Sequence, residues 1–145
     1  MSKQAEALLH GELSQVIIGS FYEVYNQLGY GFLERVYEAA LAHELTKRGL
    51  NVERQAAIRV YYDSQVVGEF FADLLVENCI IIELKAAESI HPRYEAQLLN
   101  YLKATDIEVG LLLNFGPEAS FKRKVFTNVR KKQPAKIKKN PLQSA

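Results

Sequence analysis

An α/β domain with helices packed on a mixed sheet is the fold class that this sequence predicts. The hydrophobic period is three to four residues up to Gly49 and two residues after it, so two helices precede a set of strands. A further helical segment separates the third strand pattern from the fourth, which is typical of a crossover between parallel strands. With 145 residues, 48% apolar and 24% charged, the chain is long enough for one domain with its own core.

Two helices are predicted in the N-terminal third. Apolar residues recur at three- and four-residue spacings from about Leu8 to Leu28, and Gly29 and Gly31 end this helix. A second helix is expected from about Leu33 to Arg48, with Gly49 as its C-terminal stop. The sheet therefore begins after Gly49.

Strands and one more helix account for the rest of the domain. Branched and aromatic residues with a period of two, separated by turn residues, predict the strands. Residues 80–82 are consecutive isoleucines, and a run that is apolar on both sides indicates a strand at the centre of the sheet. The expected elements are strands 52–62, 66–76 and 79–85, helix 93–104, strand 108–114 and a short edge strand 121–129.

The charge is divided unevenly along the chain. Residues 1–120 carry nine Lys and Arg against 17 Asp and Glu, whereas residues 121–145 carry nine Lys and Arg and no acid. We therefore expect a domain over residues 1–129, followed by a basic, disordered tail over residues 130–145. One interpretation of such a tail is a solvated, disordered segment that aids solubility, and another is an arm that binds phosphate groups.

The composition also excludes several classes of protein. Cys79 is the single cysteine, which rules out an internal disulfide and a cysteine-rich zinc site. No apolar run approaches the roughly 20 residues that span a bilayer. Glu6, His10 and Glu12 interrupt what would be the apolar stretch of a signal peptide. We expect a cytoplasmic protein that does not contact a membrane.

Charged residues stand in the segments that are otherwise most apolar. Asp73 interrupts the second strand, and Glu83 and Lys85 lie two residues apart near the end of the third strand. Buried charges are costly unless they are paired or bind a metal. We predict that Asp73 and Glu83 bind Mg2+, or Mn2+ in its place, and that Lys85 contacts the attacking water or a phosphate. A strand-end ion pair without chemistry is the alternative.

A shared metal site requires a particular register between the second and third strands. A two-residue turn at residues 77–78 would place residue 73 opposite residue 82, on the wrong face. A three-residue loop at residues 77–79 places residue 73 opposite residue 83 and brings both acids to one face. We therefore predict the three-residue loop, with Asn78 in the left-handed conformation.

Two helical pairs bear on the same site. Glu34 and Tyr37 share a face of the second helix, and Gln97 and Tyr101 share a face of the crossover helix. Polar residues that face a sheet need a reason, and a site shared with the strand carboxylates would supply it. For both tyrosines, half-buried packing is the stronger interpretation, and for Gln97 the alternative is a capped or solvated amide.

These segments together resemble a bacterial protein family. Residues 31–37 match the pattern after which the GxxExxY proteins are named, and the resemblance extends over about residues 12–127. This family is part of the PD-(D/E)XK nuclease-like superfamily. The later matching stretches are Phe71–Leu75, Ile82–Ala86, Ala96–Lys103 and Val109–Gly116.

The resemblance implies a fold and a set of site residues. The implied fold is a restriction-endonuclease-like core of helix, three-strand antiparallel meander, helix and strand, with an extra N-terminal helix. By position, the resemblance makes Asp73 and Glu83 the metal ligands and Lys85 the catalytic lysine. Glu34 would be an acid from the helix before the sheet.

Gln97 and Tyr101 resemble the Gln-x-x-x-Tyr element of RecB-type nucleases and complete the candidate catalytic residues. The leading hypothesis is a Mg2+-dependent nuclease that hydrolyses phosphodiester bonds of DNA or RNA. In this hypothesis the basic segment 122–139 contacts the phosphate backbone of the nucleic acid. One alternative is a nuclease-fold module that binds nucleic acid or a protein partner without cutting, and another is a homodimer with an acidic interaction face.

Overall fold

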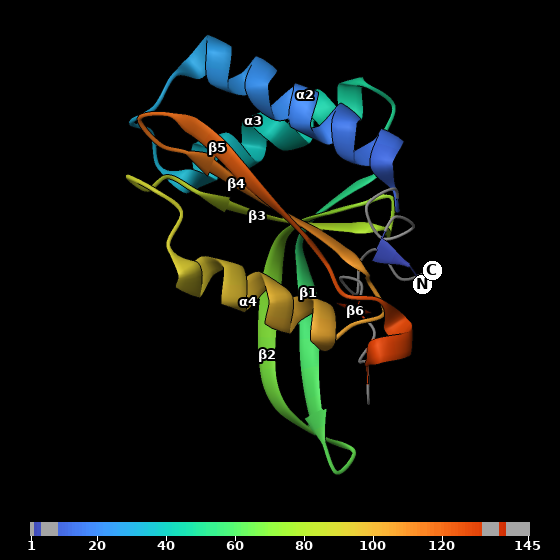
Figure 1. Cartoon of the computed structure of the whole chain (residues 1–145). Helices are drawn as coiled ribbons and strands as arrows, with labels where there is room; N and C mark the ends of the chain where they lie inside the picture. The colour runs from blue at the N-terminus through green and yellow to red at the C-terminus, as the bar shows by residue number, and fades with distance from the viewer. Residues whose placement is uncertain (1, 4–8, 132–136, 139–145) are drawn as a thin grey trace.

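A computed structural model describes residues 2–3, 9–131 and 137–138 of the chain. Its elements follow the order expected from the sequence (Figure 1). The helices are α2 (Gly11–Leu28), α3 (Glu34–Lys47), α4 (Pro92–Lys103) and the short 3-10 helix η1 (Asn128–Arg130). The strands are β1 (Val52–Tyr62), β2 (Gln65–Val76), β3 (Ile80–Lys85), β4 (Val109–Phe115), β5 (Ala119–Val125) and β6 (Ile137–Lys138).

The described strands form one mixed sheet in the order β5-β4-β3-β2-β1-β6. The first three strands are a meander of antiparallel neighbours, whereas β3 and β4 run parallel and are connected through α4. The predicted central position of β3 and the predicted parallel crossover are therefore confirmed.

Helices cover the two faces of the sheet from opposite sides (Figure 1). The helices α2 and α3 lie over a core that includes Leu74, Ile82 and Leu111. On the other face, α4 lies over a second core that includes Ala72 and Ile81. Because both faces are covered, β3 and β4 are buried along nearly their whole length.

The turn between β2 and β3 has the length that a shared carboxylate site requires. Val76 pairs with Ile80, so residues 77–79 form a three-residue loop and this prediction is confirmed. Asn78 is left-handed, as expected, with a φ of 53°. Glu77 is also left-handed, with a φ of 52°, which the sequence pattern does not indicate.

The ring of Tyr37 anchors the start of α3 in the core. It is fully buried and stacks on Phe115, with the two ring centroids 4.2 Å apart. Its hydroxyl donates to the carbonyl of Gly29 at 2.7 Å and accepts from the N–H of Phe32 at 3.2 Å. Tyr37 therefore packs in the core, fully buried rather than half-buried as predicted, and the same contacts fix the segment that carries Glu34.

The edge strand β5 ends earlier than the sequence pattern predicts. It spans Ala119–Val125, so the expectation of strand over residues 126–129 is wrong. Beyond Val125 the Glu108 carboxylate accepts the N–H of Asn128 at 2.8 Å, and the Asp106 carbonyl accepts Nδ2 of the same asparagine at 3.0 Å. These bonds replace the strand ladder and begin η1.

Most of the expected tail, residues 130–145, lies outside the described residues. Within the described part, Lys131 Nζ donates to the carbonyls of Thr105 and Ile107 at 3.0 and 2.7 Å. Burial lowers the pKa of this lysine to about 8. The strand β6 pairs with Ala57 and Ile58 of β1. These described parts are ordered against the domain, and disorder in the rest of the tail stays a prediction.

Candidate active site

The two candidate metal-binding carboxylates lie where β2 and β3 separate. The last backbone pair of these strands is Leu74–Ile82. Beyond it, the N–H of Asp73 donates to Glu83 Oε2 at 3.1 Å, and the N–H of Leu84 donates to Asp73 Oδ2 at 2.8 Å. Each carboxylate therefore satisfies a backbone donor that the diverging strands leave without a ladder partner. The structure thus brings Asp73 and Glu83 together.

The negative charge of this pair is poorly balanced by the surrounding protein. Glu83 is 6% exposed, and its pKa rises from the ordinary 4.5 to about 9. Burial is the largest cause, followed by the negative charge of Asp73, and the positive charge of Lys85 offsets only part of the rise. A bound cation would relieve this electrostatic penalty.

The surroundings of the pair fit a small, hydrated divalent cation. Asp73 and Leu84 line a cavity of about 200 Å³ between the sheet and the start of α3. Mg2+ is commonly held by one or two carboxylates while it keeps several waters. Across the described residues, no three His, Cys, Asp or Glu side chains converge as a metal cage. Asp73 lines this cavity, whereas Glu83 is 6% exposed and does not line it. Two carboxylates are a donor set of the kind that a hard divalent cation takes.

The lysine predicted for the site lies beside Glu83, at the end of β3. Lys85 Nζ lies 4.7 Å from the centroid of the Tyr94 ring, in a cation–π contact. The Arg93 guanidinium carbon lies 5.3 Å from the centroid of the same ring. Tyr94 of α4 therefore contacts two cations, and one of them, Lys85, acts on the charge of Glu83.

Helix α4 carries the two other predicted residues of this side. Exposed Gln97 donates from Nε2 to the hydroxyl of Tyr101 at 3.1 Å. Tyr101 is 7% exposed and packs in the core under α4, as the packing interpretation expects. Burial, followed by the charges of Glu83 and Asp73, raises the pKa of Tyr101 to about 12. Its hydroxyl therefore keeps its proton at neutral pH.

Glu34, the acid predicted from the helix before the sheet, lies on the α3 side of the point where β2 and β3 diverge. We call this point, with Asp73 and Glu83, the fork. Glu34 is the first residue of α3 and lines the cavity together with Asp73. Its side chain is exposed. Glu34 therefore lies on the α3 side of the Asp73 and Glu83 carboxylates. Lys85, Gln97 and Tyr101 lie on the α4 side.

Besides Arg35, two polar residues of the cavity are missed by the sequence reasoning. Glu38, one helical turn after Glu34, is 9% exposed; Arg54 Nη2 lies 2.9 Å from its Oε2. Gln55 Nε2 donates to Glu38 Oε1 at 2.5 Å and lies 3.4 Å from Asp73 Oδ1. The four-residue spacing of Glu34 and Glu38 is a sequence signal for the first residue. Nothing in the alternation of β1 marks Gln55.

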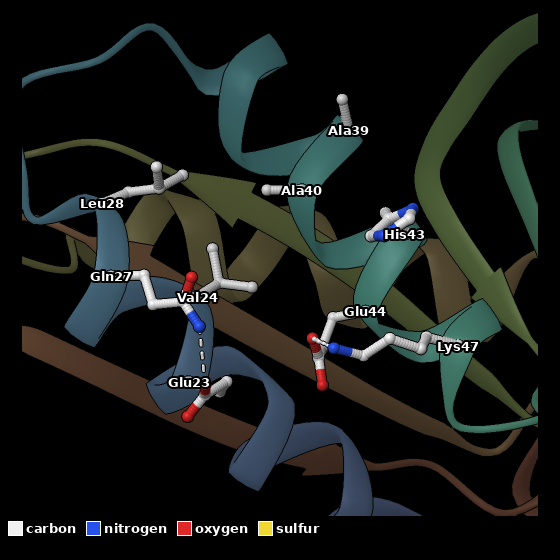
Figure 2. A pocket seen from close by; sticks show the side chains of 9 residues that line it. All are labelled: Glu23, Val24, Gln27, Leu28, Ala39, Ala40, His43, Glu44 and Lys47. Atoms are coloured by element: carbon white, nitrogen blue, oxygen red, sulfur yellow. Dashed lines mark hydrogen bonds and ion pairs between the residues drawn. The ribbon is translucent and has the colours of Figure 1, made fainter.

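A larger cavity lies between α2 and α3, away from these carboxylates (Figure 2). Its volume is about 460 Å³. Four of the polar residues there form pairs, since Gln27 donates to Glu23 at 2.7 Å and Lys47 Nζ lies 3.2 Å from Glu44 Oε1, and His43 also lines the cavity. Arg48 and then Lys47 lower the pKa of Glu44. None of the residues predicted for the active site lines this cavity.

The sheet and its covering helices define a mixed α/β domain, with two carboxylates at the point where β2 and β3 diverge. A family model described as the PD-(D/E)XK nuclease superfamily matches residues 11–125, and the chain belongs to this superfamily. The superfamily and its restriction-endonuclease-like fold are therefore confirmed. The narrower resemblance to the GxxExxY proteins stays a prediction.

A solved structure has the same fold. The crystal structure of SSO0001 is similar over 81% of this chain, with 20% sequence identity and a TM-score of 0.51. The matched region spans 60% of the SSO0001 chain, and the likeness concerns the fold alone. No curated protein matches the sequence. Among the helices of the described residues, none has the length and apolar content to cross a membrane.

Proposed function

We propose that this chain is a Mg2+-dependent nuclease that hydrolyses phosphodiester bonds of DNA or RNA. The observation that carries the proposal is the fork between β2 and β3, where Asp73 and Glu83 meet beside Lys85. Membership of a nuclease superfamily supports nucleic acid as the substrate class. The single cysteine, Cys79, suits the reducing cytoplasm as the place of action.

Asp73 and Glu83 are the residues that would hold Mg2+, and Glu34 would contact it through water. When bound, Mg2+ supplies Lewis-acid chemistry, because it polarises the phosphate and lowers the pKa of a bound water. Mn2+ prefers similar oxygen ligands and would substitute for it. The raised pKa of Glu83 supports this assignment, since it reflects negative charge that the protein leaves uncompensated.

The chain's own side chains would orient the reactants. Hydrolysis joins the oxygen of water to phosphorus and breaks one P–O ester bond, and the departing oxygen takes up a proton. The ammonium of Lys85 would leave the Tyr94 ring to position the water or to stabilise charge on the phosphate oxygens. Tyr101 keeps its proton and Gln97 presents an amide, so both would orient the substrate or the water by hydrogen bonds.

The α4 side of the molecule offers a surface for the phosphate backbone. Two cations lie near Tyr94, and two more lie near the other end of α4. There, Lys103 Nζ is 5.6 Å and Arg130 Cζ is 4.5 Å from the centroid of the Phe126 ring. Among the described residues of the basic segment 122–139, those in β5 lie at one edge of the sheet and those in β6 at the other, because β5 and β6 are its outermost strands. We therefore propose the cations along α4 as the phosphate contacts, which would be independent of base sequence.

A module that keeps the nuclease fold without cutting is the second candidate function. The ribbon of β1 and β2 exposes large apolar side chains, including Tyr62 at 74% and Val67 at 61%. Exposed apolar residues of this kind favour a protein partner, such as a second copy of the chain. This candidate predicts binding without hydrolysis.

Cleavage of plasmid DNA and of labelled DNA and RNA oligonucleotides tests the proposal. We expect hydrolysis with Mg2+ or Mn2+, none with EDTA, and a loss of about a hundredfold in Lys85→Ala. Lys47→Ala is the matched control, because Lys47 is an exposed lysine paired with Glu44. Equal cleavage by the wild type and Lys85→Ala would sink the proposal, and binding without cleavage would establish the second candidate.

A further inference from the structure

We propose that Gln55 is a positioning residue for Asp73, a role that rests on the proposed function. Gln55 has a φ of 52° in the interior of β1, where extended backbone is the rule. Such strain persists only where the surroundings over-determine it, and it concentrates at functional sites. The other left-handed non-glycine residues of the described chain lie at turns or at a helix start: His10, Asp63, Ser64, Glu77 and Asn78.

The left-handed residue coincides with a change of face in the ribbon of β1 and β2. Ala72 and Leu74 are two residues apart, so they would share a face of a regular strand. Leu74 instead packs in the core under α2 and α3, whereas Ala72 packs in the core under α4. The pairs Arg54–Leu74 and Ala56–Ala72 flank Gln55 and Asp73, so these two residues face each other where the backbone pairing of β1 and β2 is interrupted. The ribbon rotates at this position, and the rotation brings Asp73 to the cavity wall.

The side chain of Gln55 links Asp73 to a buried anchor. Its Nε2 donates to Glu38 Oε1 at 2.5 Å and lies 3.4 Å from Asp73 Oδ1. Glu38 is itself held by Arg54, whose Nη2 lies 2.9 Å from Oε2. The other oxygen of Asp73 accepts the N–H of Leu84 at 2.8 Å. The Asp73 carboxylate is therefore held from two directions, by an amide side chain and by the β3 backbone.

An amide suits this position better than a charged group. Glutamine brings two N–H donors without charge, so it orients two carboxylates and leaves the charge of Asp73 available for a cation. A lysine would compete with the metal for that charge, and a further carboxylate would repel both acids. Residues that orient metal ligands in this way commonly change metal affinity by about 10- to 100-fold when they are replaced.

Amide hydrogen exchange tests the positioning role without any metal. Gln55→Gly removes the amide and relieves the backbone strain, so Asp73 loses one of its two restraints. We expect the N–H of Leu84 to exchange about three- to tenfold faster in this variant, while the amides of residues 80–82 keep their rates. Gln65→Gly, at the far end of the same ribbon, is the matched control. A wild-type exchange rate at Leu84 in Gln55→Gly would overturn the proposal.

Mn2+ binding, followed by electron paramagnetic resonance, tests the consequence for the metal. Gln55→Asn tolerates the left-handed backbone but has a shorter amide arm, so it separates the amide from the strain. We expect both variants to bind Mn2+ at least about tenfold more weakly, and Gln55→Gly to unfold in EDTA at or above the wild-type temperature. A merely structural role would lower stability and leave affinity unchanged, which overturns the proposal. If the wild type binds no Mn2+, the proposed function fails, and the Leu84 exchange rate still decides the role of Gln55.

Discussion

Replacing Glu83 by glutamine is predicted to stabilise the metal-free protein at neutral pH. The pKa of Glu83 rises from 4.5 to about 9 on folding, because burial and the charge of Asp73 oppose ionisation. Between these pH values the folded protein binds a proton that the unfolded chain does not bind, so stability falls as the pH rises. Glutamine has nearly the same shape and no ionisable group, so the stability of Glu83→Gln should not decrease with rising pH for this reason.

The size of the effect follows from the linkage between protonation and folding. Each pH unit within this window costs the wild type about 1.4 kcal/mol of stability. At pH 7 the total reaches up to about 3 kcal/mol, and it vanishes near pH 4.5. We therefore expect the free energy of unfolding of Glu83→Gln to exceed that of the wild type by up to about 3 kcal/mol at pH 7.

Urea unfolding in EDTA, from about pH 4.5 to about pH 8, measures this difference. The exposed ion pair of Glu69 and Arg59 supplies a control, because Glu69→Gln should change stability by less than about 1 kcal/mol. Added Mg2+ should reduce the difference in the free energy of unfolding between Glu83→Gln and the wild type. Binding of Mg2+ stabilises the wild type, whereas Glu83→Gln lacks one of the carboxylates that would hold it. A variant less stable than the wild type at pH 7 in EDTA, or a gap that does not change with pH, would refute the reasoning.

The remaining predictions concern the α4 surface and the packing beside it. Lys103→Ala and Arg130→Ala should each weaken nucleic-acid binding. Each should also reduce the slope of log affinity against log salt concentration by about one, as measured by fluorescence anisotropy. Unchanged slopes would exclude this surface as the phosphate-binding site. Gly116→Ala should lose about 1–3 kcal/mol of stability, because a Cβ there would lie 2.2 Å from the carbonyl oxygen of Ala87. Gly11→Ala, with nothing within 4 Å of its added Cβ, is the control in thermal unfolding, and equal losses would contradict the packing argument.

The register of the carboxylate pair could be predicted from sequence because it depends on counting. Side chains alternate along a strand, so a three-residue loop after Val76 is enough to bring residues 73 and 83 opposite each other. The central place of β3 is also indicated by its sequence, since three successive isoleucines favour a strand covered on both faces. Local periodicity therefore carries most of the fold.

Other parts of the site depend on contacts that alternation does not encode. Gln55 breaks the alternation of β1, and the break is stabilised by Glu38 of α3, which is 17 residues away in the sequence. The position of Lys85 over Tyr94 likewise depends on how α4 packs on the sheet. The extra pairing of β6 with β1 joins residues that are 79 and 81 positions apart in the sequence. Such non-local contacts override propensity and leave no mark in the local pattern.

The fork between β2 and β3 connects the stability of this domain to its proposed chemistry. Strands that diverge leave backbone N–H groups without partners, and Asp73 and Glu83 accept two of these donors. A neutral acceptor such as asparagine or glutamine would do the same without burying charge, so hydrogen bonding alone does not explain carboxylates at both positions. A cation does explain them, because it would pair with the ionised form of both carboxylates, which without a cation is so unfavourable that Glu83 keeps its proton up to about pH 9. The Glu83→Gln variant separates the two requirements, since it keeps an acceptor at the fork and removes the charge.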